Sequence, residues 1–114
     1  MAEVARLFVD AGSIVLVSLI SPFRTERLTA RNLFEPGEFV EVFVDTPLEI
    51  CEARDPKGLY RRARKGDIPN FTGIHSAYEP PEAPEMVVRT ENLTSIEAAA
   101  TVIDSLVRQG RIRL

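Results

Sequence analysis

The chain has 114 residues, of which 45% are hydrophobic and 27% are charged, and its formal net charge is −3. A chain of this length forms one domain and can bury roughly two-thirds of its unfolded surface, so we expect a core. The acidic balance argues against a general role in binding nucleic acid or a membrane surface. The single cysteine, Cys51, cannot form an internal disulfide, and no apolar run approaches the length of a membrane span. We therefore expect a protein of the reducing cytoplasm.

Residues 2–11 predict an amphipathic helix. Three apolar side chains recur at helical spacing and form one face: Val4, Leu7 and Phe8. No capping residue precedes Ala2, so the helix has no start signal of its own. This is a first indication that the chain begins part-way through a larger unit.

Three β-prone runs predict a parallel sheet. Residues 13–20 are a nearly continuous β-branched and apolar run, which is typical of a strand buried on both faces. A second run covers 39–44, and a shorter third run covers 86–90. Helices are predicted over 25–33 and 95–109. Because helices separate the strands, the pattern indicates the α/β class with a parallel sheet.

Two capping boxes predict helix starts at Thr46 with Glu49 and at Thr94 with Glu97. Pro47 supports the first of them, because proline is favoured at the first helical position. That helix is expected to run to about Arg54.

The stretch between the second and third predicted strands is the most unusual part of the chain. Residues 54–67 contain six cations and two anions, although the whole chain is acidic. Such a compact cationic segment favours a small, strongly anionic ligand, with a solvated basic helix as the alternative. The short helix predicted over 58–65 has glycine at both ends and few apolar residues, so we interpret it as a mobile lid.

The lid is followed by a long loop, residues 66–84, with two glycines and four prolines. A loop of this length inside a domain is usually functional or disordered. Ligands of parallel sheets bind beyond the carboxyl ends of the strands, where Ser21–Arg24 and Asp45–Thr46 are predicted to lie. We expect the lid and the long loop on the same side.

Common catalytic and metal-binding motifs are absent. The chain has no G-x-x-x-x-G-K-[ST] phosphate loop and no G-x-G-x-x-G fingerprint. His75 is the only histidine, and no metal-ligand spacing is present. We interpret His75 as a surface loop residue and Cys51 as a packing residue.

Three sequence motifs nevertheless resemble one enzyme family. They are I-S-P-F-R-T-E-R at 20–27, V-F-V-D-T-P-L-E-I-C-E-A-R-D-P-K-G-L-Y-R-R-A-R-K-G-D-I at 42–68, and N-F-T-G-I-H-S-A-Y-E-P-P-E-A-P-E at 70–85. They are similar to the adenylylsulfate kinases, P-loop enzymes that transfer the γ-phosphoryl group of Mg-ATP to the 3′-hydroxyl of adenosine 5′-phosphosulfate (APS). The similarity runs from about residue 3 to residue 112.

The resemblance implies a fold and a domain organisation. The fold is an α/β, partial P-loop kinase-type parallel sheet with flanking helices and a lid segment. Residues 1–114 are one domain, with the lid and substrate loop at about 55–85. Family members carry their phosphate loop N-terminal to every motif found here, so the chain resembles the C-terminal two-thirds of the domain, truncated at its N-terminus.

The resemblance also implies two groups of binding residues. Those for APS are Ile20, Ser21, Pro22, Arg24, Phe71, Thr72 and Gly73. Those for ATP are Arg54, Lys57 and Arg61, and Lys57 is the catalytic candidate. Within the first group, Ser21 is a candidate phosphoserine as well as a binding residue, and Phe71 stacks on the APS adenine. The guanidinium groups of Arg24 and Arg27 suit phosphate or sulfate oxygens, with a plain helix-surface charge as the alternative for Arg27.

The implied ligands are ATP and APS, with Mg²⁺ as the cofactor that accompanies ATP; no metal ligand is identified in this chain. No nucleic acid or membrane partner is expected. The family resemblance is compatible with a homodimer and with a fusion to, or complex with, a sulfurylase. Two alternatives remain open: another P-loop small-molecule kinase, and a non-catalytic fragment that keeps the lid and part of the APS site.

Overall fold

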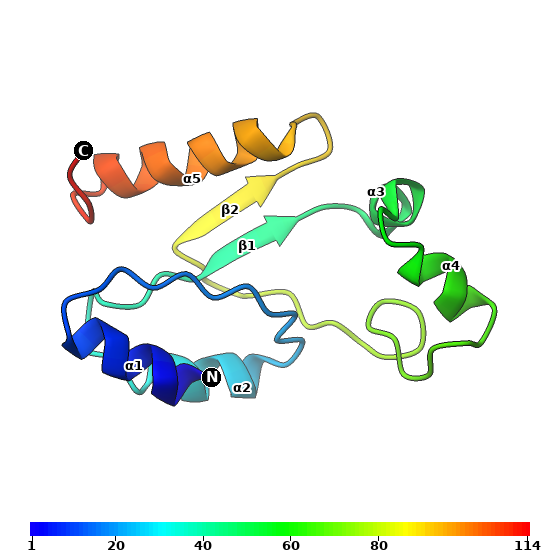
Figure 1. Cartoon of the computed structure of the whole chain (residues 1–114), viewed down its shortest axis with the longest axis horizontal. Helices are drawn as coiled ribbons and strands as arrows, with labels where there is room; N and C mark the ends of the chain where they lie inside the picture. The colour runs from blue at the N-terminus through cyan, green and yellow to red at the C-terminus, as the bar shows by residue number, and fades with distance from the viewer.

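The computed structural model describes all 114 residues, and the chain forms five helices and two strands joined by turns and loops (Figure 1). In chain order the elements are α1 (Ala2–Asp10), α2 (Arg24–Arg31), β1 (Val42–Asp45), α3 (Leu48–Arg54), α4 (Leu59–Arg64), β2 (Met86–Arg89) and α5 (Ser95–Arg108). Each helix lies within two residues of its predicted range. No helix combines the length and the hydrophobicity that crossing a membrane requires.

The two strands pair in parallel, with Val42 opposite Met86 and Asp45 opposite Arg89. Helix α5 packs against β2 and runs alongside the sheet in Figure 1. Burial alternates along β2, because Met86 and Val88 are buried whereas Val87 and Arg89 are exposed. This period of two is the pattern of a strand with one covered face. The predicted parallel α/β arrangement is therefore confirmed, although β1 begins three residues later than expected.

The prediction of a strand over residues 13–20 is wrong for this chain. The segment is extended, but no hydrogen bond involves the backbone of residues 14–20. Its side chains are exposed, with Leu16 at 89% and Ile14 at 77%. An apolar, β-branched run indicates that a segment favours burial. A buried strand also needs neighbouring strands whose backbones pair with its N–H and C=O groups. No strand pairs with this segment to provide those neighbours.

A cavity of about 300 Å³ lies between the extended segment, α1, α2 and the approach to β1. Its lining is mainly hydrophobic and includes Val15, Val17, Leu19, Phe39 and Val42. The segment thus stands apart from β1 rather than packing on it. The outer edge of β1 consequently remains without a strand partner, as does the outer edge of β2.

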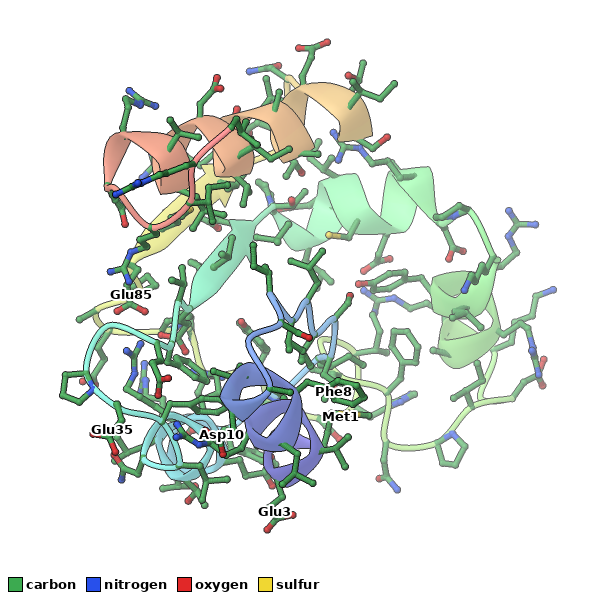
Figure 2. The ribbon with its side chains drawn as sticks, turned by 60° about the vertical axis from the view of Figure 1, so that its left-hand side comes forward. Met1, Glu3, Phe8, Asp10, Glu35 and Glu85 are labelled. Atoms are coloured by element: carbon green, nitrogen blue, oxygen red, sulfur yellow. The ribbon has the colours of Figure 1, made fainter.

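The expected core is also largely missing, because only four residues are buried: Ala5, Ala63, Met86 and Val88. The radius of gyration is 15.8 Å, against about 13 Å for a compact domain of this length. In α1, Leu7 and Phe8 are exposed, so the apolar face that the sequence predicts has no cover. In Figure 2, Phe8 and Met1 lie on the opposite side of α1 from Asp10 and Glu35.

One of the two predicted capping residues, Thr94, caps its helix as expected. At the start of α5, the Glu97 N–H donates to Thr94 Oγ1 over 3.2 Å. At α3, no side chain caps the helix, and Pro47 occupies the cap position. The Thr46 hydroxyl instead meets the Thr90 hydroxyl beyond β2. The tertiary contact between the two strand ends has therefore replaced the local capping interaction.

Candidate functional site

The turn at Ser21–Pro22 is held by a segment more than fifty residues further along the chain. The Glu79 N–H donates to the Pro22 carbonyl over 2.8 Å, and the Arg24 N–H donates to Glu79 Oε1 over 2.8 Å. The Arg24 Nε also donates to the Pro80 carbonyl over 2.9 Å. These bonds join the I-S-P-F-R motif to Glu79 and Pro80, at the end of the long loop.

Ser21 has a φ of +43°, in the left-handed region that non-glycine residues rarely adopt. Such conformations persist only where the surroundings fix them, and they cluster at functional sites. Ile20 beside it is 66% exposed, whereas Ser21 and Pro22 are partly buried. The turn is therefore a constrained structure at the surface, although sequence alone gives no sign of the strained φ.

Arg27 occupies a different position from either of its two predicted ones. Its Nη1 donates to the Ser21 carbonyl and its Nη2 donates to the Glu79 carbonyl, each over 2.5 Å. Its Nε lies 3.2 Å from Glu41 Oε2, and its side chain is only 11% exposed. It is thus neither a solvated surface charge nor a cation free to meet an anion. Sequence analysis missed this role, because nothing in the spacing shows that Glu79 returns to α2.

Residues 70–76 form a tight turn that presents Phe71. Three amides donate to the Phe71 carbonyl: those of Ile74, His75 and Ser76. His75 Nδ1 accepts the Phe71 N–H over 3.2 Å, so His75 stabilises the turn in addition to being exposed as predicted. Phe71 itself is half-buried.

Thr72 and Gly73 lie inside the same turn. Gly73 has a φ of +90°, and its N–H donates to the Ser76 carbonyl over 2.8 Å. A Cβ at this position would lie 3.3 Å from Leu48 Cδ1 of α3. Any side chain here would therefore be strained by its backbone conformation and crowded by α3.

The predicted lid helix, α4, is joined to the Phe71 turn by an aromatic contact. The Tyr60 and Phe71 rings meet edge-on, with centroids 5.0 Å apart. Burial of the phenol, followed by the neighbouring Cys51, raises the pKa of Tyr60. The α4 residue Ala63 is fully buried. Helix α4 thus has a packed side, which qualifies the expectation that little holds it in place.

Asp55 caps α4 from the preceding loop, a role that sequence analysis missed. Its Oδ1 accepts the Tyr60 N–H over 3.0 Å, and its Oδ2 accepts the Arg61 N–H over 3.1 Å. These are two of the amide groups that a helix leaves unpaired at its start. The signal was available, because an aspartate shortly before a helix is a common capping residue.

Cations of the lid differ in their availability. Arg64 pairs with Glu52 over 2.6 Å. No ion pair or side-chain hydrogen bond engages the remaining four: Lys57, Arg61, Arg62 and Lys65. Figure 1 shows α3 and α4 beyond the carboxyl end of β1, with the loop that follows α4 returning past them toward β2. The charges therefore lie at the end of the sheet where ligands of parallel sheets bind.

Arg54 is engaged within the protein. It donates to Thr90 Oγ1 over 3.0 Å, to the Thr90 carbonyl over 2.7 Å and to the Glu91 carbonyl over 3.2 Å. Its guanidinium group links the end of α3 to the loop after β2, at the carboxyl edge of the sheet. Arg54 therefore lies where a nucleotide would be expected, but its guanidinium group connects α3 to the loop after β2.

The chain does not offer a metal site of its own. No three histidine, cysteine, aspartate or glutamate side chains converge closely enough to hold a metal ion. The residues present therefore do not fit a resident Mg²⁺.

Comparison with known proteins matches this chain to one family. The family model described as Adenylylsulphate kinase matches residues 1–89. The adenylyl-sulfate kinase of Aeromonas hydrophila subsp. hydrophila is 56% identical over 114 residues, which are 100% of this chain and 56% of that protein. The bifunctional enzyme NodQ of Rhizobium meliloti is 64% identical over 90 residues, which are 79% of this chain and 14% of that protein.

A solved structure is similar as well. It is the Mycobacterium tuberculosis APS kinase CysC in complex with AMPPNP and APS, at 45% identity and a TM-score of 0.85. The match covers 93% of this chain and 62% of that one. The chain spans just over half the length of the adenylyl-sulfate kinases that it matches.

Proposed function

Because this chain belongs to the adenylylsulfate kinase family, we propose that it supplies the lid and the sulfated-nucleotide loop of an enzyme that phosphorylates APS. The reaction transfers the γ-phosphoryl group of ATP to the 3′-hydroxyl of APS and yields ADP and 3′-phosphoadenosine 5′-phosphosulfate. Phosphoryl transfer of this kind depends mainly on positioning and on compensating the charge of the phosphoryl oxygens. The chain's contacts suit both tasks.

Two turns form the APS end of this site. The Ser21–Pro22 turn receives the phosphosulfate group, with Ile20 and Arg24 at its margins. The Phe71 ring receives the adenine, with Thr72 and Gly73 shaping the backbone beside it. The bonds from Arg24 to Glu79 and Pro80 support the first assignment, because they fix the Ser21–Pro22 turn against the end of the long loop.

The ATP end consists of the lid and its hinge. Lys57 lies between the Asp55 cap and the start of α4, and Arg61 is on the first turn of α4. Both side chains are free of protein partners, so they are available for phosphate oxygens. A lid that closes over ATP supplies positive charge and excludes water, which would otherwise accept the phosphoryl group. Mg²⁺ would arrive with the ATP phosphates, as it commonly does at such sites.

The observation that most supports this proposal is the overlap, over 93% of the chain, with a kinase whose structure contains AMPPNP and APS. The direct test is calorimetric titration of the 114-residue chain with APS. Saturable APS binding that is lost in Phe71→Ala would support the assignment. No binding of APS to the folded chain would contradict it.

Catalysis by these 114 residues alone is a separate matter, because they contain no G-x-x-x-x-G-K-[ST] segment. A second candidate role is therefore a non-catalytic unit that binds APS without turning it over. A coupled assay for ADP release in the presence of ATP and APS separates the two. We expect turnover only when the chain replaces the matching segment of the Aeromonas enzyme, and none from the chain alone.

The partners of the whole protein follow as further proposals. One relative is named a bifunctional enzyme, and the chain matches only 14% of it. We therefore include a second activity, such as a sulfurylase, on the same or an associated chain. We also propose that the whole protein forms a homodimer, which size-exclusion chromatography with light scattering tests.

A further inference from the structure

The Ser21–Pro22 turn depends on one side chain more than on any other. Ser21 has a left-handed φ of +43°, a conformation that its surroundings must impose. The hydrogen bond to the Ser21 carbonyl comes from Arg27 of α2, six residues further along the chain. No hydrogen bond within the turn itself holds this conformation.

All three guanidinium nitrogens of Arg27 have partners within the protein. Nη1 reaches the Ser21 carbonyl, Nη2 reaches the Glu79 carbonyl, and Nε faces Glu41. The group also lies 5.7 Å from the centre of the Tyr78 ring. Because a planar fork with several donors makes these contacts at once, a lysine ammonium cannot reproduce them.

Glu79 completes the same arrangement from the long loop. Its N–H donates to the Pro22 carbonyl, and its carboxylate accepts the Arg24 N–H. Arg27 therefore holds both sides of the turn: Ser21 directly, and Pro22 and Arg24 through Glu79. Without Arg27, two part-buried carbonyl groups would lose their donors, and Ser21 could relax to a more common conformation.

We propose that Arg27 is a positioning residue, which holds the Ser21–Pro22 turn in its left-handed shape and thereby sets the affinity for the sulfated end of the nucleotide. The proposal deepens the proposed function and rests on it for the identity of the ligand. Its structural half, that Arg27 fixes the turn, can be tested without any ligand.

The test compares the 114-residue chain with Arg27→Lys and with the matched control Arg31→Lys. Arg31 is one turn further along α2 and pairs with Glu85 over 2.8 Å, but it does not contact the turn. The first measurement is amide hydrogen exchange at Arg24 and Glu79, whose N–H groups both donate within this arrangement. We expect exchange to accelerate by about tenfold in Arg27→Lys and to be unchanged in Arg31→Lys.

The second measurement separates positioning from general loss of structure. APS and adenosine are titrated into each variant, because adenosine keeps the base but lacks the phosphosulfate group. Arg27→Lys should weaken APS by about tenfold and leave adenosine unchanged. A similar loss for both ligands would mean general disruption and would overturn the proposal.

Unchanged exchange at both amides in Arg27→Lys would also overturn it, whatever the ligand data show. If the unaltered chain does not bind APS, the proposed function fails, and the exchange rates still decide whether Arg27 holds the turn. Should Arg27→Lys fail to fold, Arg27→Gln, which shortens the side chain and removes its charge, takes its place in both measurements. The same results then support or overturn the proposal.

Discussion

The Tyr60 ring of α4 lies edge-on to the Phe71 ring, with centroids 5.0 Å apart and ring planes 72° apart. The lid and the proposed adenine-binding turn therefore share a packing contact in the absence of ligand. If Phe71 stacks on a base, that base would lie beside Tyr60, so we expect nucleotide binding at Phe71 to restrict the movement of α4.

Replacing Phe71 with alanine should weaken APS binding by about 5- to 150-fold, because stacking on a base contributes about 1–3 kcal/mol. The affinity for an ATP analogue should change little. Titration calorimetry with both ligands measures the difference. Phe34→Ala is the matched control, since Phe34 pairs with Phe39 in another part of the molecule. Equal losses for the two nucleotides would assign Phe71 a packing role only.

Lys57→Ala should lower kcat/KM for ATP by about 10- to 150-fold, as expected from the loss of a hydrogen bond to a charged group. The measurement uses the chimaera in which this chain replaces the matching segment of the Aeromonas enzyme. Lys65→Ala, at the other end of α4, serves as the control. A rate unchanged by Lys57→Ala would remove Lys57 from the nucleotide site.

Asp55→Ala should destabilise the first turn of α4 by about 1 kcal/mol, the usual effect of removing a capping side chain. Amide exchange should accelerate at Tyr60 and Arg61, the two residues whose N–H groups Asp55 accepts. Asp67→Ala changes an exposed aspartate beyond the end of the helix and should leave both amides as they are. If Asp55→Ala also left them protected, the cap would not be what orders the lid.

Acid should weaken the contact between α2 and the start of β2 through Glu85. Burial alone would raise the pKa of Glu85, but hydrogen bonds from Arg31 and from the Glu41 N–H outweigh it and lower the pKa below 4.5. A lowered folded-state pKa means that the stabilisation is complete above pH 4.5 and is lost as the pH falls through the folded value.

Urea unfolding between pH 3 and 7 measures this effect of Glu85. The unaltered chain should lose stability below about pH 4.5, and Glu85→Gln should show a shallower decline. Glu82→Gln, whose carboxylate is 78% exposed, is the control and should follow the unaltered chain. A decline as steep in Glu85→Gln as in the unaltered chain would contradict the role of this carboxylate.

Leu16→Lys should reduce self-association of the chain. Leu16 is 89% exposed in an extended segment whose backbone has no hydrogen-bond partner, which is the arrangement that invites pairing between molecules. Light scattering across a concentration series measures the effect. Ile96→Lys changes an apolar residue that is 81% exposed but lies in helix α5 rather than in an extended segment, so it should have a smaller effect. Equal effects would point to general hydrophobicity instead.

Local signals in the sequence predicted the helices well. Helical periodicity located α1 and α5, and the Thr94–Glu97 capping box identified the start of α5 because no tertiary contact competes for Thr94. The same signal failed at Thr46, where the hydroxyl meets Thr90 from the next strand. Capping rules describe local competition and cannot anticipate a partner more than forty residues away.

Two other features depend on distant parts of the chain in the same way. Residues 13–20 have the composition of a buried strand, but composition does not supply the neighbouring strands. Arg27 resembles a surface cation by its helical position, yet Glu41, Glu79 and Ser21 together take up its guanidinium group. The site residues could be named by resemblance, whereas the interactions that hold them could be found only in three dimensions.

The parallel pairing of β1 with β2 makes everything between them a closed loop that includes α3, α4 and the Phe71 turn. The entropy lost in closing such a loop grows only slowly with its length, so the two short strands can hold it closed. A nucleotide that bridges α4 and the Phe71 turn would restrict this loop further. It would bind the folded state of the chain and not the unfolded state. Its concentration should therefore raise the melting temperature of the sheet, so a thermal shift would report ligand binding even in a chain that performs no chemistry.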